Sequence, residues 1–600
     1  MNALDNDPFA DEMERLGTAD MEPESPRPSN SVKWPQGYVL DSKGLWFDPG
    51  EDKPRSRLSG PFAVLGLARD PNGDGWSIAL EWHDRDHIQH RHFLPLADLI
   101  GDGTEVLKPL AAGGLELSPH SDRLKKFKAA LVGLNCGSRV RLVRRSGWHG
   151  DVFVLPHATV GQEPGESVIY DGKADAARYG ENGTLAEWIE KVAKPAAGNS
   201  RLVLSLSTAF AGPLVDLLND EGGGVHLVGG SSLGKSTALI VAGSVWGGGG
   251  RGGFTQTWRA TGNALEAIAR AHSGTLLALD ELGELDAREA GSTAYLLVNG
   301  QGKARATRDA EVRARSEWRI MLLSSGEIGL GDKIAETGKR AKAGQLIRLV
   351  DVPADAGKGL GLFEDTNGHD PAEFSKQIKT AALRIYGTAG KAFVEYLADD
   401  PEAVAEAARQ RIADMQRTLL EGIGETSGQA YRVAHRFALI ATAGEFARVA
   451  LSLPWAEGEA ERAAAVCFDA WRGTLGGEGP GELVSAVEAI KAAVEKHGES
   501  RFRKIYDDGL PATDSAPIRD LLGYRLSRDG EVLWGFTSTG WKEVLAGIAE
   551  AKGIARMMAE RGALVFSKND KAHRLHIKVE GRAVPVYAVK ASAFEQWGAL

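Results

Sequence analysis

The stretch His226-Leu-Val-Gly-Gly-Ser-Ser-Leu-Gly-Lys-Ser-Thr237 decides the fold of this chain. It contains Gly229-x-x-x-x-Gly234-Lys235-Ser236, the spacing of a phosphate-binding loop. The apolar run Val225–Val228 before it has the length of a buried strand, and the run 237–243 after it fits a helix. Glycines let backbone N–H groups surround a phosphate, and the start of a helix adds a favourable dipole. The stretch therefore predicts an α/β fold, with a parallel sheet flanked by helices, that holds a nucleoside triphosphate.

The residues of this loop have separate expected roles. Lys235 should reach the β- and γ-phosphates, and the hydroxyl of Ser236 should ligate Mg²⁺. The expected cofactors are therefore ATP and Mg²⁺. The alternative, a glycine-rich turn followed by a chance Lys-Ser pair, does not account for the flanking strand and helix. The predicted nucleotide contacts are Gly229, Gly230, Ser231, Ser232, Leu233, Gly234, Lys235, Ser236 and Thr237.

A second apolar run, Gly274–Leu279, ends in the carboxylates Asp280 and Glu281. Open α/β sheets bind their ligands at the carboxyl ends of their strands. Asp280 is expected to hold Mg²⁺ through water, and Glu281 to orient and activate the attacking water. A small-molecule kinase does not need that water, so the pair favours hydrolysis. The alternative is a strand end followed by an ordinary acidic helix.

A third apolar run, Trp318–Leu323, ends in Ser324-Ser325-Gly326-Glu327. Small polar residues at this point resemble sensor 1 of the AAA+ ATPases. Ser324 or Ser325 would then form a hydrogen bond with the γ-phosphate or the attacking water. Of the two, Ser325 is the candidate catalytic residue. A plain junction between strand and turn remains an alternative.

Between the second and third runs lies a basic segment with alternating residues, which predicts a β-hairpin. Lys303, Arg305 and Arg308 on this segment would suit contacts to nucleic-acid phosphates. The alternative is a hairpin with ordinary solvated charge.

Composition limits the remaining possibilities. The chain has 600 residues, a net charge of −10 and two cysteines, Cys136 and Cys467. Too few cysteines are present for a disulfide framework or a zinc site that depends on them, which fits a cytoplasmic protein. No membrane-spanning run or secretion signal is visible. Because the chain is acidic overall, any contact to nucleic acid must come from a local patch or from the lumen of a ring.

The pattern of runs and breakers divides the chain into five parts. These are a disordered acidic, Pro-rich tail at 1–36, a β-rich domain at 37–165, a phosphate-loop core at 185–355, a helical lid or bundle at 370–493, and an α+β domain at 498–600. Two helices followed by a hairpin in the last part are compatible with a winged helix or with another α+β arrangement.

Two clusters in the β-rich part have competing interpretations. His83, His87, His90 and His92 match no standard zinc spacing and are expected to lie on a polar hairpin. The arginines at 139–145 with Trp148 could form a nucleic-acid collar, but a packing role for Trp148 is favoured.

The order of these motifs resembles a known family, the cassette-chromosome (Cch-like) helicases, whose ATPase domain is often described only as a bacterial and phage domain of unknown function. The similarity lies in Gly229–Ser236, 257–266, 279–282, 299–303, Trp318–Glu327 and 343–345, with Ser146–His149, 153–156, 432–440 and 443–445 around them.

The resemblance implies an MCM-like AAA+ ATPase that assembles as a homo-hexamer and acts as a DNA helicase of a phage or mobile element, on single-stranded or forked DNA. It also implies an arginine donated by a neighbouring subunit, for which Arg340 is the first candidate and Arg348 the second. A lid arginine acting within the same subunit would be Arg432, with Arg436 in reserve. The alternative function is a nucleotide-gated assembly or initiator switch that binds DNA or protein partners without unwinding.

Overall fold

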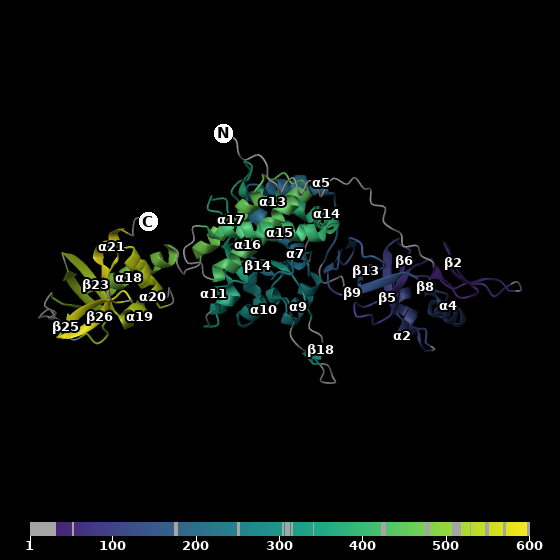
Figure 1. Ribbon diagram of the computed structural model, residues 1–600, viewed down its shortest axis with the longest axis horizontal. Helices are drawn as coiled ribbons and strands as arrows, with labels where there is room; N and C mark the ends of the chain where they lie inside the picture. The colour runs from purple at the N-terminus through teal and green to yellow at the C-terminus, as the bar shows by residue number, and fades with distance from the viewer. Residues whose placement is uncertain are drawn as a thin grey trace. The chain divides into compact units, whose positions relative to one another are not determined.

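The chain of the computed structural model divides into two compact units, Met1–Phe468 and Asp469–Leu600 (Figure 1). Of the tail predicted to be disordered, residues 1–31 lie outside the described residues. No helix in the described part of the chain combines the length and the apolar character that crossing a membrane requires. The described residues are 32–50, 53–101, 103–172, 178–248, 253–302, 305–306, 312–313, 316–339, 341–421, 428–474, 480–506, 518–528, 530–546, 551–567, 570 and 572–596.

A five-stranded sheet forms the centre of the first unit, in the order β15-β16-β19-β14-β20. Every neighbouring pair in it is parallel. The prediction of an α/β fold with a parallel sheet is therefore confirmed. The strands are β14 (Gly223–Val228), β15 (Gln256–Thr257), β16 (Leu276–Asp280), β19 (Met321–Gly326) and β20 (Leu349–Pro353).

Helices cover both faces of this sheet, which explains why its strands are almost continuously apolar. Leu277, Leu279 and Leu322 point to one face and pack in a cluster with α9, α10 and α11. The intervening residues point to the other face, where α7 and α8 contact β16 and β19. The helices are α7 (Ser200–Leu217), α8 (Lys235–Gly243), α9 (Gly262–Ala271), α10 (Ala287–Asn299) and α11 (Leu330–Ala335).

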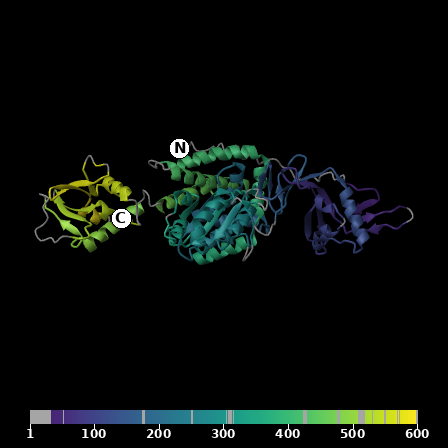
Figure 2. The ribbon, with the colours of Figure 1, turned by 90° about the horizontal axis from the view of Figure 1, so that it is seen from below.

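A helical bundle follows the sheet in the chain and packs against α7 and α8. Its central helix, α16, buries Phe437, Ile440 and Phe446 and lies along α7 and α15. In Figure 2 the green helices of this bundle lie over the teal sheet. The helices are α13 (Pro371–Arg384), α14 (Thr388–Asp399), α15 (Pro401–Leu420), α16 (Gly428–Ala450) and α17 (Glu459–Thr474).

The N-terminal part of the first unit contains a mixed sheet in the order β13-β9-β5-β6-β7. Phe127 and Leu131 of α4 (Ser121–Gly133) share a core with Leu80 and Trp82 of this sheet. The strands are β5 (Ala63–Arg69), β6 (Ser77–His83), β7 (Gln89–Pro95), β9 (Arg139–Val143) and β13 (Ser167–Tyr170). Shorter strands are β1 (Val32–Lys33), β2 (Tyr38–Asp41), β3 (Gly44–Phe47), β4 (Ser56–Arg57), β8 (Asn135–Cys136), β10 (Gly147–His149), β11 (Val152–Val154) and β12 (Thr159–Val160).

The predicted histidine cluster lies on and between β6 and β7, which pair as an antiparallel hairpin. His90 Nε2 is 2.8 Å from Asp84 Oδ2, so this imidazole already has a carboxylate partner. Among the described residues, no three or more histidine, cysteine and acidic side chains are grouped so that they could hold a metal ion.

The Ser146–His149 motif joins the N-terminal part to the core. Asp216 of α7 accepts hydrogen bonds from Arg145 Nη1 at 2.9 Å and from the backbone N–H of Trp148 at 2.7 Å. Trp148 is buried and donates its indole N–H to Pro213 O at 3.0 Å. Arg141 pairs with Glu163 at 3.0 Å. These contacts contradict a nucleic-acid collar with Trp148 as the stacking residue, because the indole and Arg145 serve packing and ion pairing instead.

The second unit is an α+β domain with a sheet in the order β21-β22-β23-β26-β24, to which β25 pairs through β26. Its strands are β21 (Phe502–Lys504), β22 (Gly523–Arg528), β23 (Glu531–Thr537), β24 (Leu564–Val565), β25 (Leu575–Val579) and β26 (Arg582–Lys590), and its helices α18 (Pro480–His497), α19 (Ser538–Val544), α20 (Ala551–Glu560) and α21 (Ala591–Gln596). The β22–β23 hairpin was not predicted. The winged-helix interpretation stays a prediction, as do the finer domain boundaries.

One expected boundary in this region differs from the division of the chain into two compact units. The helical bundle was expected to extend to residue 493, but α18 belongs to the second unit. Its residues Ala486, Val487 and Ile490 pack in one core with Phe502 and Trp541. A helical pattern shows that α18 is amphipathic, but it does not show which core the apolar face joins.

The close packing of Gly147 against Asp216, where the N-terminal part meets the core, leads to a testable prediction. Gly147 has φ of +103°, and a Cβ there would overlap the Asp216 carboxylate. Gly147→Ala should therefore lower the free energy of unfolding by about 2–4 kcal/mol, from backbone strain and overpacking together. Gly50→Ala is the matched control, because Gly50 has a similar φ of +105° with open space around it. Its expected cost is about 1 kcal/mol. Urea unfolding measures both variants. Equal losses in the free energy of unfolding would contradict the close packing of Gly147 against Asp216.

Candidate nucleotide-binding site

The glycine loop leaves β14 at Val228 and enters α8 at Lys235, as predicted. Gly229 donates its backbone N–H to Gly326 O at 3.2 Å, which fixes the loop to β19. Gly234 has φ of +99°, a conformation that favours glycine. The backbone N–H groups of Gly230 to Gly234 have no acceptor among the described residues. These donors, next to the N-terminus of a nine-residue helix, are suited to phosphate oxygens.

Three side chains at the start of α8 have different environments. Lys235 is buried, and its ammonium donates to Gly229 O at 2.7 Å and to Gly230 O at 2.5 Å. Ser236 is exposed, so its hydroxyl is accessible to a cation. Thr237, by contrast, is buried, and its hydroxyl lies 2.8 Å from Ser375 Oγ of α13. The side chain of Thr237 therefore contacts the bundle, and only its backbone remains for a nucleotide.

The carboxylates lie at the same edge of the sheet as the glycine loop. In the register of the parallel strands, Leu227 of β14 is opposite Ser325 of β19, and Leu279 of β16 is opposite Ser324. Asp280 follows Leu279 and accepts a hydrogen bond from the Ser325 hydroxyl. Because β19 alone separates β14 from β16, the loop and Asp280 are about 10 Å apart across the sheet. That spacing fits a triphosphate with its metal ion.

Glu281 has an unusual backbone conformation, with φ of 60° and ψ of 74°. Its N–H donates to Ser325 Oγ at 3.5 Å. A residue other than glycine in the left-handed region costs on the order of 1 kcal/mol or more, and such residues cluster at functional sites. The strained turn directs the chain out of the sheet immediately after Asp280.

The structure distinguishes the two candidate serines. The strand was expected to end at Leu323, but β19 continues to Gly326, so both serines lie within it. Successive side chains on a strand point to opposite faces. Ser324 therefore lies in the core, where it contacts His226 Nδ1 at 2.9 Å and accepts from Trp258 Nε1 at 2.8 Å. Ser325 points toward Asp280, and its expected role at the γ-phosphate stays a prediction.

His226 and Trp258 were not identified from the sequence as parts of the site. His226 is fully buried in β14, and its Nε2 is 3.0 Å from Ile328 O. Burial lowers the pKa of His226 to about 4, so the imidazole is neutral near pH 7. A histidine inside an otherwise apolar strand of the quoted stretch was the one available signal. Together the two side chains position β19 beside the glycine loop.

The predicted basic hairpin exists between α10 and β19. Strands β17 (Arg305–Ala306) and β18 (Val312–Arg313) pair antiparallel, and β18 lies away from the body of the core in Figure 1. Lys303 and Arg308 lie outside the described residues, as does Arg340, the first candidate for the arginine donated between subunits. Arg348, the second candidate, lies with its guanidinium 4.2 Å from the ring centre of Tyr295.

The arginines of α16 do not lie near the glycine loop of their own chain. Arg436 is buried against the backbone of Gly223, at the amino end of β14, and donates to Ile347 O. Arg432 is exposed one helical turn earlier, and nearby His435 Nε2 lies 2.6 Å from Asp220, which precedes β14. The glycine loop follows the opposite end of β14. The expected role of Arg432 or Arg436 in binding the nucleotide of the same subunit does not fit this position, because the fold directs this end of α16 to the wrong edge of the sheet.

Asp351 is a buried carboxyl group behind the site. It lies on β20 opposite His226, and its Oδ1 accepts the backbone N–H of Leu330 at 3.4 Å. Burial, together with a smaller contribution from the charge of Asp332, raises the pKa of Asp351 to about 7. Proton uptake by this group thus favours the folded state.

A pH dependence follows from this raised pKa. The stabilising effect of Asp351 is present below its ordinary pKa and is lost as the pH rises from about 4 to about 7. Asp351→Asn should therefore be more stable than the wild type at pH 8, by up to about 4 kcal/mol, with a smaller advantage at pH 5. Urea unfolding at both pH values measures this. A constant difference between the two proteins would rule out titration of Asp351 in this range.

Comparison with known proteins shows similarity both to a family model and to solved structures. Residues 38–317 match the model of a family described as "Domain of unknown function (DUF927)", a span that includes the glycine loop and Asp280 but not β19. Comparison with curated proteins gives no match. Among solved structures, the chain is similar to "SCCmec type IV Cch - active helicase", with a TM-score of 0.62 and 17% sequence identity over 94% of this chain and 99% of the other. The chain thus contains a region similar to the DUF927 family and shares its fold, over nearly its whole length, with a Cch helicase.

Proposed function

We propose that this protein is an ATP-hydrolysing motor of the AAA+ class that moves along DNA. The observation that supports it best is the convergence of three groups at one edge of a parallel sheet. Free backbone N–H groups and Lys235 lie at the end of β14, Asp280 and Glu281 at the end of β16, and Ser325 on the strand between them. This set provides donors for phosphate, oxygen ligands for a cation and a carboxylate that can act on water.

Each group has a part in the proposed reaction. Lys235 and the loop N–H groups bind phosphate oxygens and offset the charge that moves during transfer. Ser236 and Asp280 hold Mg²⁺, because hydroxyl and carboxylate oxygens are the ligands that this ion prefers. Glu281 orients the attacking water, and Ser325 holds Asp280 in place and lies within reach of the same water.

The proposal includes assembly as a homo-hexameric ring akin to the MCM helicases, with Arg340 donated to the site of the next subunit. A fold shared with a protein whose description reads "active helicase" supports a motor. Strands β17 and β18 emerge close to the catalytic strands, between α10 and β19, so movement at the site can reach the hairpin. A net charge of −10 restricts DNA contact to such a local basic segment.

Variants of the two groups test the chemistry. Lys235→Ala should abolish ATP hydrolysis, because the phosphates lose their main cation. Glu281→Gln should retain ATP binding and lower turnover by about 100-fold or more, since only the activation of water is lost. Nucleotide binding and phosphate release with Mg²⁺ and DNA present measure both effects. Wild-type turnover by Glu281→Gln would exclude Glu281 as the residue that activates water.

A triple variant, in which Lys303, Arg305 and Arg308 are changed to Ala, tests the proposed DNA contact. It should keep basal hydrolysis and lose stimulation by single-stranded DNA. Each lost phosphate contact should reduce the slope of log affinity against log salt by about 0.7, so the slope falls by about 2. The control is an equal loss of charge at the exposed residues Lys376, Arg409 and Arg417 of the bundle.

Two outcomes would revise this part of the proposal. DNA stimulation that survives the hairpin variant would exclude the hairpin as the DNA contact. Slow hydrolysis without displacement of a strand from a forked duplex would instead favour the nucleotide-gated assembly switch.

A further inference from the structure

The segment that follows β20 runs beside the glycine loop. Ala354 donates its N–H to Val228 O at 2.8 Å, directly before the loop, and Leu362 donates to Leu233 O at 2.9 Å, within it. Between these contacts, the N–H of Ala356 bonds Gly361 O at 2.8 Å and closes a small turn. The backbone of this segment is thus fixed to the backbone that surrounds the expected phosphates.

Packing between the segment and the loop is close. A Cβ on Gly361 would lie 3.0 Å from Leu233 O, and one on Gly234 would lie 3.4 Å from both Leu362 and Phe363. Leu362 and Phe363 are buried, and Phe363 makes an edge contact with Phe374 of α13. A shift of the segment would therefore move Leu233 and Gly234, which belong to the nucleotide-binding loop.

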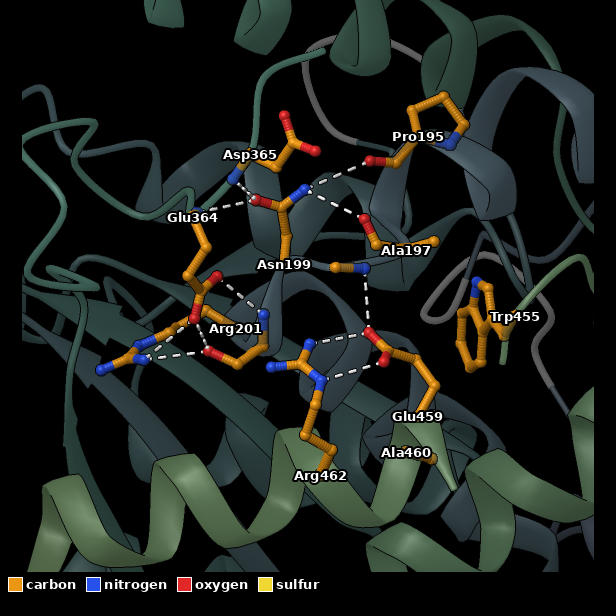
Figure 3. Close-up of polar contacts among 12 residues, drawn as sticks. Pro195, Ala197, Asn199, Arg201, Glu364, Asp365, Trp455, Glu459, Ala460 and Arg462 are labelled. Carbon is orange, nitrogen blue, oxygen red and sulfur yellow. Dashed lines mark hydrogen bonds and ion pairs between the residues drawn. The ribbon is translucent and has the colours of Figure 1, made fainter. Parts of the chain in front are cut away.

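Glu364 anchors the end of this segment (Figure 3). Its carboxylate accepts the backbone N–H of Ser200 at 2.8 Å and the Ser200 hydroxyl, and it lies 3.5 Å from Arg201 Nη1. The side chain of Asn199 accepts the backbone N–H groups of Glu364 at 2.8 Å and Asp365 at 3.0 Å. The segment thus ends on the amino terminus of α7.

Arg201 holds the beginning of the same segment. Its Nε donates to Pro353 O at 3.2 Å and its Nη2 to Asp355 O at 3.1 Å. The Arg201 side chain is only 5% exposed, so its charge depends on the Glu364 carboxylate for compensation. The ion pair between the buried Arg201 and the partly buried Glu364 therefore fixes both ends of Ala354–Glu364.

We propose that Ala354–Phe363 is a second wall of the nucleotide-binding site and that Glu364 is its positioning residue. This inference rests on the proposed ATPase function and adds a determinant of nucleotide affinity outside the phosphate-loop motif. Glu364 does not contact the phosphates in this proposal. It holds the wall, and the wall holds the loop N–H groups in the geometry that binds the triphosphate.

A second carboxylate in the same network serves as a matched control. Glu459 accepts the N–H of Gly198 at 2.8 Å and pairs with Arg462 at 2.7 Å. It lies at the start of α17 and is drawn with Glu364 in Figure 3, and none of the hydrogen bonds of its carboxylate goes to the 354–363 wall. Loss of Glu459 should therefore weaken the fold without moving the glycine loop.

The experiment measures ATP affinity and turnover separately in the full-length protein. Glu364→Gln should weaken ATP binding roughly tenfold, which corresponds to about 1.4 kcal/mol, with turnover at saturating ATP within about twofold of the wild type. Glu364→Ala should weaken binding further. Glu459→Gln should keep the wild-type dissociation constant for ATP even if its unfolding midpoint falls as far as that of Glu364→Gln.

A second pair of variants tests the wall without touching the ion pair. Gly361→Ala should also weaken ATP binding, because the added carbon presses on Leu233 O. Gly359→Ala is its control, since Gly359 has a similar φ of +72° with open space around it. If the Glu364 variants fail to fold, the Gly361 and Gly359 variants still test whether the 354–363 wall affects ATP binding.

The outcomes separate this inference from the proposed function. Wild-type ATP affinity in the folded Glu364 and Gly361 variants overturns the wall and leaves the ATPase proposal standing. Equal losses in Glu459→Gln or Gly359→Ala also overturn it, because general destabilisation would then explain the effect. A wild-type protein that binds no ATP overturns both.

Discussion

The parallel register of β14, β19 and β16 is the constraint on which the site depends. It brings the carboxyl ends of three strands, separated by up to a hundred residues in the chain, to one edge of the sheet. The phosphate-binding loop, Ser325 and Asp280 meet there because parallel strands all present the same end. A shift of β19 by one residue would exchange the faces of Ser324 and Ser325 and remove the hydroxyl that holds Asp280.

Buried polar contacts maintain this register. His226, on the neighbouring strand β14, and Trp258, directly after β15, both bond Ser324, which satisfies a hydroxyl that would otherwise be costly in an apolar core. On the other side of the loop, Glu364 and Arg201 hold the segment after β20. The loop is thus supported by two networks, neither of which supplies a residue to the phosphate-binding motif. Such support keeps flexible glycines in a geometry that binds a ligand without a large ordering cost.

Helix α7 connects these features across the first unit. Its amino end carries Asn199, Ser200 and Arg201 beside the wall, and Asp216 near its carboxyl end binds the N-terminal part through Trp148. The similarity of Ser146–His149 to the Cch-like family is therefore explained by packing rather than by contact with a ligand. A single buried helix therefore contacts both the segment beside the glycine loop and the N-terminal part.

The sequence by itself determined the glycine loop, the Asp280–Glu281 strand end, the hairpin before β19 and the parallel α/β core, because each depends on neighbouring residues and on the periodicity of one element. Only the tertiary structure shows which of Ser324 and Ser325 contacts Asp280, that Arg432 lies away from the glycine loop, and that α18 belongs to the second unit. Those outcomes depend on which face of an element is covered and on which end of the sheet it approaches. Contacts between residues more than a hundred positions apart fix both, and no local pattern contains them.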